Sequence, residues 1–192
     1  ESSFWNESVV GLAHEFEQLL RETLRLQREV GLSEDSCAVL PSIASHTQNV
    51  CAWEWAPLIE FLRDAWDGLR SQDETTAAQM ARRWVKDDSD TFKRLALYAA
   101  AHCPSIEASE WSQWLQTNLW RIDLRREICR LLVLRGNELA GAELHDLETE
   151  ILRGEDASVN RDWYCHLFLS KLQRSGAALS GASIKIVGEH SD

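Results

Sequence analysis

Glycine and proline are scarce in this chain, with nine and three residues out of 192. Both residues punctuate turns and interrupt helices, so their scarcity favours long helices joined by short connections. Alternating apolar and polar residues, the mark of a half-buried strand, occur only in the short stretch SIKIVG at residues 183–188. We therefore predict an all-α fold, in which this stretch forms a strand or a frayed end.

Positive charge is also in short supply: 20 Lys and Arg face 31 Asp and Glu, and the formal net charge is −11. Proteins that bind nucleic acids or anionic membranes gain affinity from clustered Lys and Arg, so this charge argues against both kinds of partner. No apolar run approaches the roughly 20 residues of a membrane-spanning helix, and the N-terminus lacks the features of a secretory signal. We expect a soluble, cytoplasmic protein that contacts neither nucleic acid nor membrane.

Complete catalytic and cofactor-binding motifs are absent from the sequence. It contains no CxxC pair, no GxGxxG loop and no GxSxG elbow. Gly176 and Gly181 have the spacing of a phosphate-binding loop, but Ala182 stands where that loop needs lysine. His145 and Glu148 are spaced for a metal on a helix, yet they lie among surface acids. We therefore predict no catalytic residue, no bound metal and no cofactor.

The cysteines are odd in number and widely spaced. They are Cys37, Cys51, Cys103, Cys129 and Cys165, and most stand among apolar residues in helical patterns. A chain of this length with 44% apolar residues can bury a sizeable core without a disulfide framework. We interpret the cysteines as reduced thiols of the core.

Apolar residues at helical spacing dominate the chain. In residues 8–30 they recur every three or four positions, Leu12 and Leu19 among them, with charged residues on the opposite face. A second amphipathic helix begins near Glu54, and further helices follow at short intervals. The stretch FKRLALYAAAHC at residues 92–103 is apolar on nearly every side, so we expect that helix to be enclosed. The pattern predicts about seven to nine helices.

Three tryptophans point to an internal repeat. Trp55, Trp111 and Trp163 each stand near the start of an expected helix, at intervals of 56 and 52 residues. Chance recurrence of aromatic residues on amphipathic helices explains the spacing equally well. We predict a helical-repeat, solenoid-like array, with an irregular helical bundle as the alternative. The array forms a single domain over residues 1–174; residues 175–192, which open with the small, flexible sequence SGAALSGA, form a flexible tail or start a further segment.

Two arginines fall on the packed sides of helices. Arg94 lies inside the apolar helix of residues 92–103, and helical angles place Arg125 beside Ile128 and Cys129. A buried guanidinium needs a carboxylate or a carbonyl partner. We predict that each arginine forms a structural ion pair across helices. An anion-binding site at Arg125 is the alternative.

A polar segment precedes the second helix and lacks clean helical periodicity. It contains His46, Gln48 and Asn49, followed by Trp53 and Trp55. Such polar residues can cap the following helix and hydrogen-bond loop backbone, which is our first interpretation. The alternative is a recognition surface in which the two tryptophans act as anchors beside amide donors. These five residues form the candidate interaction surface.

Four segments in order, PSIASHTQN, WAPLIEFLRDAW, FKRLALYAAAHC and LRREICRLLVLRGNELAGAELHDLETEIL, carry a resemblance. Together they resemble the helical region of large bacterial antiphage defence proteins, in which a sirtuin-like or other effector domain precedes a helical array. The resemblance covers roughly residues 41–172 and rests on packing patterns. It implies that such a region links effector to sensor, or senses infection itself, while the chemistry belongs elsewhere in the parent chain. The start at Glu1 and a single Met, Met80, lead us to expect a segment of a longer polypeptide.

Two functional hypotheses follow. The first is a noncatalytic helical scaffold or sensor that contacts a protein partner or neighbouring domains of its own chain, in an oligomeric state that the sequence leaves open. The second is an enzyme or small-molecule binder whose site forms between helices. That site would use Arg94, Arg125 and His46 with a carboxylate such as Asp64 or Glu107. We favour the first hypothesis.

Overall fold

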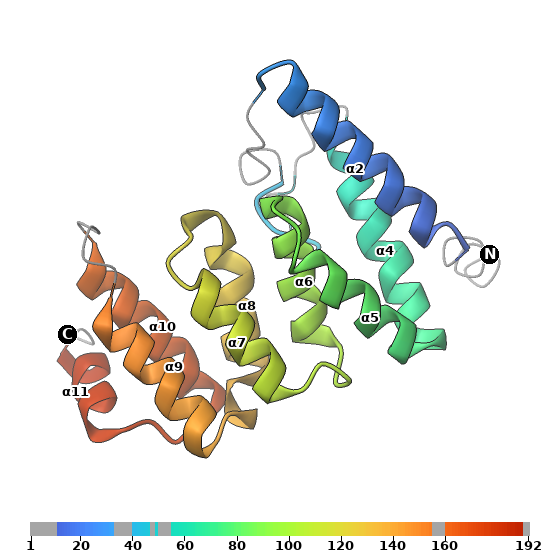
Figure 1. Ribbon diagram of the computed structural model, residues 1–192. Coiled ribbons are helices and arrows are strands. Elements are labelled where there is room, and N and C mark those ends of the chain that lie inside the picture. The colour runs from blue at the N-terminus through green and yellow to red at the C-terminus, as the bar shows by residue number, and fades with distance from the viewer. Residues whose placement is uncertain (1–10, 33–39, 47–48, 50–54, 155–159, 190–192) are drawn as a thin grey trace. The chain divides into compact units, whose positions relative to one another are not determined.

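The computed structural model describes residues 11–32, 40–46, 49, 55–154 and 160–189. Over these residues the protein has nine α-helices, two short 3-10 helices and no strand (Figure 1). The predicted all-α class is therefore confirmed. Within the same residues, no helix is both long and apolar enough to cross a membrane.

The contacts divide the chain into two compact units, Glu1–Ser105 and Ile106–Asp192. The repeat arrangement and the single domain over residues 1–174 stay predictions.

The first unit stacks its described helices in chain order. Helix α2 (Ala13–Glu29) packs on α4 (Ala56–Gln72), α4 packs on α5 (Glu74–Trp84), and α5 packs on α6 (Asp90–His102) (Figure 1). Polar caps set the starts of two helices. The Asp73 carboxylate accepts the Thr76 amide at 3.0 Å at the start of α5, and the Ser89 hydroxyl accepts the Phe92 amide at 3.4 Å at the start of α6.

Aromatic side chains fill the core of the first unit. The ring of Trp66 lies 6.3 Å from that of Trp84 and 6.1 Å from that of Tyr98, and Trp84 lies 6.4 Å from Phe92. The Trp66 indole donates to the Ala77 carbonyl at 2.9 Å, which ties α4 to α5. Ten residues of α6 are buried, so this helix is enclosed as its apolar sequence predicted.

The second unit contains the other five of the described α-helices. They are α7 (Ala108–Asn118), α8 (Arg125–Arg135), α9 (Gly141–Arg153), α10 (Arg161–Ser175) and α11 (Gly181–Glu189), with 3-10 turns at Ile122–Leu124 and Gly136–Glu138. Helix α10 packs on α8, α9 and α11, and α7 packs on α9. Helices α8 and α10 run parallel, because Arg125 meets Tyr164 near one end and Gly136 lies against Ser175 at the other.

The C-terminal segment corrects one expectation from the sequence. The stretch SIKIVG lies within α11 and not in a strand. The Ser180 hydroxyl accepts the Ser183 amide at 3.3 Å, and the Glu148 carboxylate accepts the Ser180 amide at 2.8 Å. Ser183 and Val187 are the buried residues of α11 and lie one helical turn apart, so the apparent alternation also fits a short helix. Residues 176–180 join α10 to α11.

Candidate functional site

Helix α2 and the two residues that flank it carry a row of side chains on the surface, all of them apolar except Thr23. Leu12, Leu19, Leu26 and Val30 are exposed by between 43 and 71% of their areas. Phe16 and Thr23, which are half-buried, fall between them. The spacing alternates between four and three residues, so all six lie on one face of the helix. We call this face the α2 stripe: Leu12, Phe16, Leu19, Thr23, Leu26 and Val30.

A different face of α2 does the packing. Ala13, Glu17, Leu20 and Leu24 are the buried residues of the helix, and α2 packs on α4. At about 100° of rotation per residue, their direction lies roughly 110° from that of the α2 stripe. The described fold therefore covers one face of α2 and leaves a second apolar face in solvent. Helical periodicity in the sequence does not separate these two faces, because it places Leu12 and Leu19 in the same apolar series as the packing residues.

An ionic network holds the packed side of α2 in place. Arg21 pairs with the buried Glu17 at 2.8 Å and with Asp87, and its guanidinium lies 4.2 Å from the centre of the Phe92 ring. Arg83 reaches Glu17 at 3.5 Å. Because these contacts tie α2 to α5, to α6 and to the segment between them, they fix the direction in which the α2 stripe faces.

Helix α4 extends the apolar surface. Phe61 is 43% exposed, and its ring stacks on that of Phe16 with the centroids 5.6 Å apart. Exposed apolar residues thus continue from α2 onto its neighbour. Contiguous apolar surface of this kind marks interaction sites more often than scattered single residues do.

One edge of the α2 stripe is acidic. Glu15, Glu22 and Glu29 recur every seven residues on the side away from α4. Arg25 pairs with Glu22 at 2.6 Å and comes within 3.9 Å of Glu29, but these are exposed pairs that screen the charge only in part. Glu15 has no ion-pair partner among the described residues. The stripe therefore presents an apolar centre beside a negative edge.

The polar segment before α4 is only partly described. The Asn49 side chain donates to the carbonyls of Ser42 at 2.8 Å and Ala44 at 3.1 Å, and accepts the Ser42 amide at 3.2 Å. Asn49 therefore hydrogen-bonds the backbone of its own loop, which is the structural role that our first interpretation gives to this segment. His46 is exposed and Trp55 is half-buried at the start of α4. Gln48 and Trp53 lie outside the described residues, so a recognition surface here stays a prediction.

The structure shows a neutral oxygen beside each of the two arginines. Arg94 is 0% exposed and donates to the Leu40 carbonyl at 2.7 Å. Arg125 donates to the Tyr164 hydroxyl at 2.8 Å, and its guanidinium lies 5.7 and 5.5 Å from the ring centres of Trp163 and Tyr164. Among the described residues the hydrogen-bond partner of Arg125 is the Tyr164 hydroxyl, and an ion pair there stays a prediction. Because α8 and α10 pack in parallel, Trp163 and Tyr164 in the first turn of α10 lie beside Arg125.

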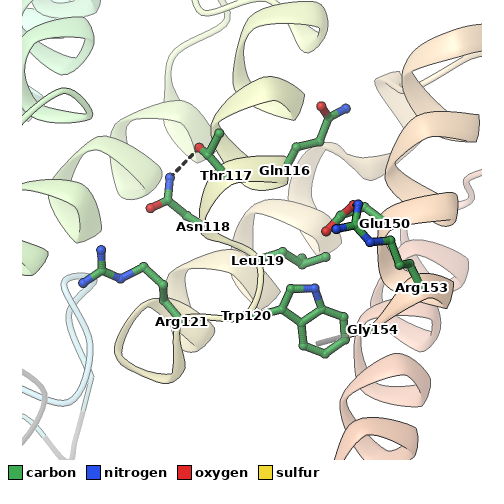
Figure 2. Close-up of a pocket in the computed structure, with 9 residues that line it drawn as sticks. All are labelled: Gln116, Thr117, Asn118, Leu119, Trp120, Arg121, Glu150, Arg153 and Gly154. Atoms are coloured by element: carbon green, nitrogen blue, oxygen red, sulfur yellow. Dashed lines mark hydrogen bonds and ion pairs between the residues drawn. The ribbon is translucent and has the colours of Figure 1, made fainter. Parts of the chain in front are cut away.

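A polar cavity of about 460 Å³ lies where the C-terminal ends of α7 and α9 approach each other (Figure 2). Its walls include Trp120 and Arg121 beyond α7, and Glu150 and Arg153 on α9. Glu150 and Arg153 pair at 3.4 Å, so their charges balance. The Trp120 indole nitrogen is buried and has no hydrogen-bond partner among the described residues. The cavity presents no adjacent nucleophile and base.

The thiols are poorly suited to nucleophilic chemistry. Burial raises the pKa of Cys129 to about 11 and also raises the pKa of Cys165. Cys129 and Cys165 are free thiols, and Cys37 and Cys51 lie outside the described residues. A protonated thiol is a weak nucleophile, so the two residues with raised pKa values act as packing groups.

The remaining polar candidates are separated or already engaged. Glu148 is buried and accepts the Ser180 amide, whereas His145 is exposed. No group of three metal-ligating side chains occurs in the part of the chain that the structure describes. Asp64, proposed as a partner in an enzymatic site, pairs with Arg63 at 2.7 Å.

Comparison with known proteins gives no relative: no protein-family model, no curated protein and no solved structure matches the chain.

Proposed function

We propose that this chain is a noncatalytic helical interaction module of a larger bacterial protein. It binds an amphipathic helix, supplied by a protein partner or by a neighbouring domain of its own chain, along the α2 stripe. The observation that carries the proposal is the second apolar face of α2, exposed beside a face that is already packed. Seating an amphipathic helix on such a surface is a common mode of peptide recognition.

The charge of the edge selects the partner. A second copy of α2 lying antiparallel would bring the row Glu15, Glu22 and Glu29 against itself, and like charges across a helix interface cost stability. A helix with an apolar seam flanked by Lys and Arg would pair its cations with this row. We therefore assign the α2 stripe a basic amphipathic helix in preference to an antiparallel second copy of α2.

The size of the effect follows from the buried area. Full burial of a leucine contributes about 1.5–3 kcal/mol, and the stripe leucines are about half buried already, so each has about 1 kcal/mol left to offer. Replacing Leu19 by glutamine removes this gain and places an amide in an apolar contact, at a further cost of about 1 kcal/mol. The sum corresponds to a loss of affinity of about 10- to 30-fold.

The resemblance to antiphage defence proteins supports a place for the module in defence. In that setting it connects an effector domain to a sensor, or takes part in sensing. Catalysis then belongs to other parts of the parent protein.

The test uses a helical peptide with leucine at the seam and lysine on both flanks, titrated into the whole chain by fluorescence anisotropy. We expect saturable binding that Leu19→Gln weakens about 10- to 30-fold. Leu134→Gln is the matched control, because Leu134 is exposed by 49%, close to the 53% of Leu19, but lies on α8. A peptide with glutamate in place of lysine should bind at least about 10-fold more weakly.

Three outcomes would contradict the proposal. The first is no binding of the lysine peptide, and the second is equal weakening by Leu19→Gln and Leu134→Gln. The third is a concentration-dependent dimer, seen by sedimentation, that Leu19→Gln abolishes, because a second copy would then be the occupant.

A further inference from the structure

Helices α8 and α10 concentrate positive charge in an acidic protein. Together Arg125–Arg135 and Arg161–Ser175 contain seven Arg and Lys and two acidic residues, whereas the whole chain has a net charge of −11. The helices pack on each other and run parallel. Their starting turns therefore lie together, and the positive ends of the two helix dipoles add to the local potential.

Arg125 is held at this end of the helix pair by aromatic rings. Its Nη1 donates to the Tyr164 hydroxyl at 2.8 Å, and its guanidinium lies within 6 Å of the ring centres of Trp163 and Tyr164. Trp163 meets Tyr164 edge to face at 4.9 Å. These contacts fix the direction of the guanidinium and leave its other N–H donors without a hydrogen-bond partner among the described residues.

The cluster is accessible from solvent. Trp163 is 51% exposed, and Arg125 and Tyr164 are half-buried. A second cation, Lys171, lies on α10. Both Lys171 and Arg125 are near enough to act electrostatically on Cys129, which lies one turn after Arg125. Of the two acids on these helices, Glu127 is buried and Asp162 adjoins Trp163. We call Arg125, Trp163 and Tyr164 the arginine–aromatic cluster.

We propose that the arginine–aromatic cluster binds a carboxylate side chain of a short acidic protein segment. The planar guanidinium of Arg125 matches a carboxylate through paired N–H donors, and the exposed ring of Trp163 covers the apolar stem of the same side chain. Tryptophan, tyrosine and arginine are also the residues that most often dominate binding energy at protein interfaces. This site lies in the second unit and takes a ligand of opposite charge to that of the α2 stripe, so it does not depend on the proposed function.

The chemistry favours an acidic peptide over a nucleic acid. A polynucleotide gains affinity from many phosphate contacts spread along its length, whereas this chain outside α8 and α10 is strongly acidic. A single oriented guanidinium with an aromatic wall suits one carboxylate and a few flanking residues. Nucleic acid binding becomes an outcome of the test.

The test measures anisotropy of a labelled ten-residue peptide of alternating Glu and Leu, titrated with the whole chain. We expect Arg125→Gln and Trp163→Ala each to weaken binding at least about 10-fold, and Arg125→Lys to restore part of the affinity. Arg126→Gln is the matched control: it removes the same charge from the next, exposed position and should change the affinity by less than about threefold. Circular dichroism establishes that each variant is folded. If Arg125→Gln unfolds, Trp163→Ala still tests the proposal, because the Trp163 side chain is half exposed.

Several results would overturn the proposal. The first is that the acidic peptide does not bind. The second is that Arg125→Gln and Arg126→Gln lower its affinity equally, or that Trp163→Ala leaves the affinity unchanged. The third is that an oligothymidylate of ten nucleotides binds more tightly than the acidic peptide. Unchanged peptide binding by the Leu19→Gln variant is expected, since the α2 stripe belongs to the other unit.

Discussion

The turn after α9 provides a sharp test of how the second unit is held together. Gly154 ends that helix with φ +65° and ψ 167°, a conformation that is nearly restricted to glycine. The Arg161 side chain lies over it and donates to the carbonyls of Leu152 at 2.7 Å and Arg153 at 2.8 Å. A Cβ atom at position 154 would overlap Nε and Cδ of Arg161 and lie 2.9 Å from its Cγ. Alanine there must therefore strain the backbone and displace the arginine that caps α9.

We expect Gly154→Ala to lower the free energy of unfolding by about 2–4 kcal/mol. Backbone strain accounts for about 1–3 kcal/mol, and loss of the two hydrogen bonds from an exposed arginine for about 1 kcal/mol more. Urea unfolding followed by tryptophan fluorescence should show a midpoint lower by about 1–2 M.

Gly176→Ala is the control for this prediction. Gly176 also has positive φ, at +92°, but no heavy atom lies within 4 Å of the place that a Cβ atom would take, so the cost should be only about 1 kcal/mol. In an Arg161→Ala background, Gly154→Ala should lose the part of its effect that comes from the overlap. Equal effects of the two glycine substitutions, or strict additivity with Arg161→Ala, would refute this reasoning.

Three further predictions concern single contacts. Tyr98→Phe should cost about 1 kcal/mol in urea unfolding, because the Tyr98 hydroxyl donates to Asp67 at 2.7 Å; an unchanged midpoint would mean that water replaces the bond without loss. Cys129, whose pKa burial raises to about 11, should react with iodoacetamide at pH 8 at least about 10-fold more slowly than a cysteine peptide; an equal rate would contradict its burial. Hydrogen bonds from Thr76 lower the pKa of Asp73, so this carboxylate stabilises the folded chain above its ordinary pKa, and the contribution is lost as the pH falls through the lowered value. Asp73→Asn should remove that part of the acid sensitivity, and an unchanged pH profile of unfolding would count against it.

Helical periodicity predicted most of the fold because it reflects local constraints. The apolar sequence of residues 92–103 indicated an enclosed helix, and α6 is enclosed. The Ser89 hydroxyl caps the start of this helix, as serine commonly does. The helix at the C-terminus was missed because SIKIVG is too short to separate a period of two from one of 3.6.

Side-chain partners were harder to predict because they depend on which helices become neighbours. Arg125 was expected on a packed side, but its tyrosine partner follows from the parallel packing of α8 and α10, which the sequence does not encode locally. Part of the α2 stripe can be recognised in the sequence. Leu12, Leu19 and Leu26 recur every seven residues, as do the glutamates of the acidic edge, yet only the structure separates this face from the one that packs.

The central claim is that the α2 stripe seats a basic amphipathic helix. Its most direct test is a methyl NMR titration of the whole chain, labelled at leucine, with the lysine-flanked peptide. We predict the largest shift changes at Leu12, Leu19 and Leu26, with Leu134 and the buried Leu20 nearly unchanged. Changes that centre on α8 or α10, or that spread evenly over the leucines of both units, would contradict the account.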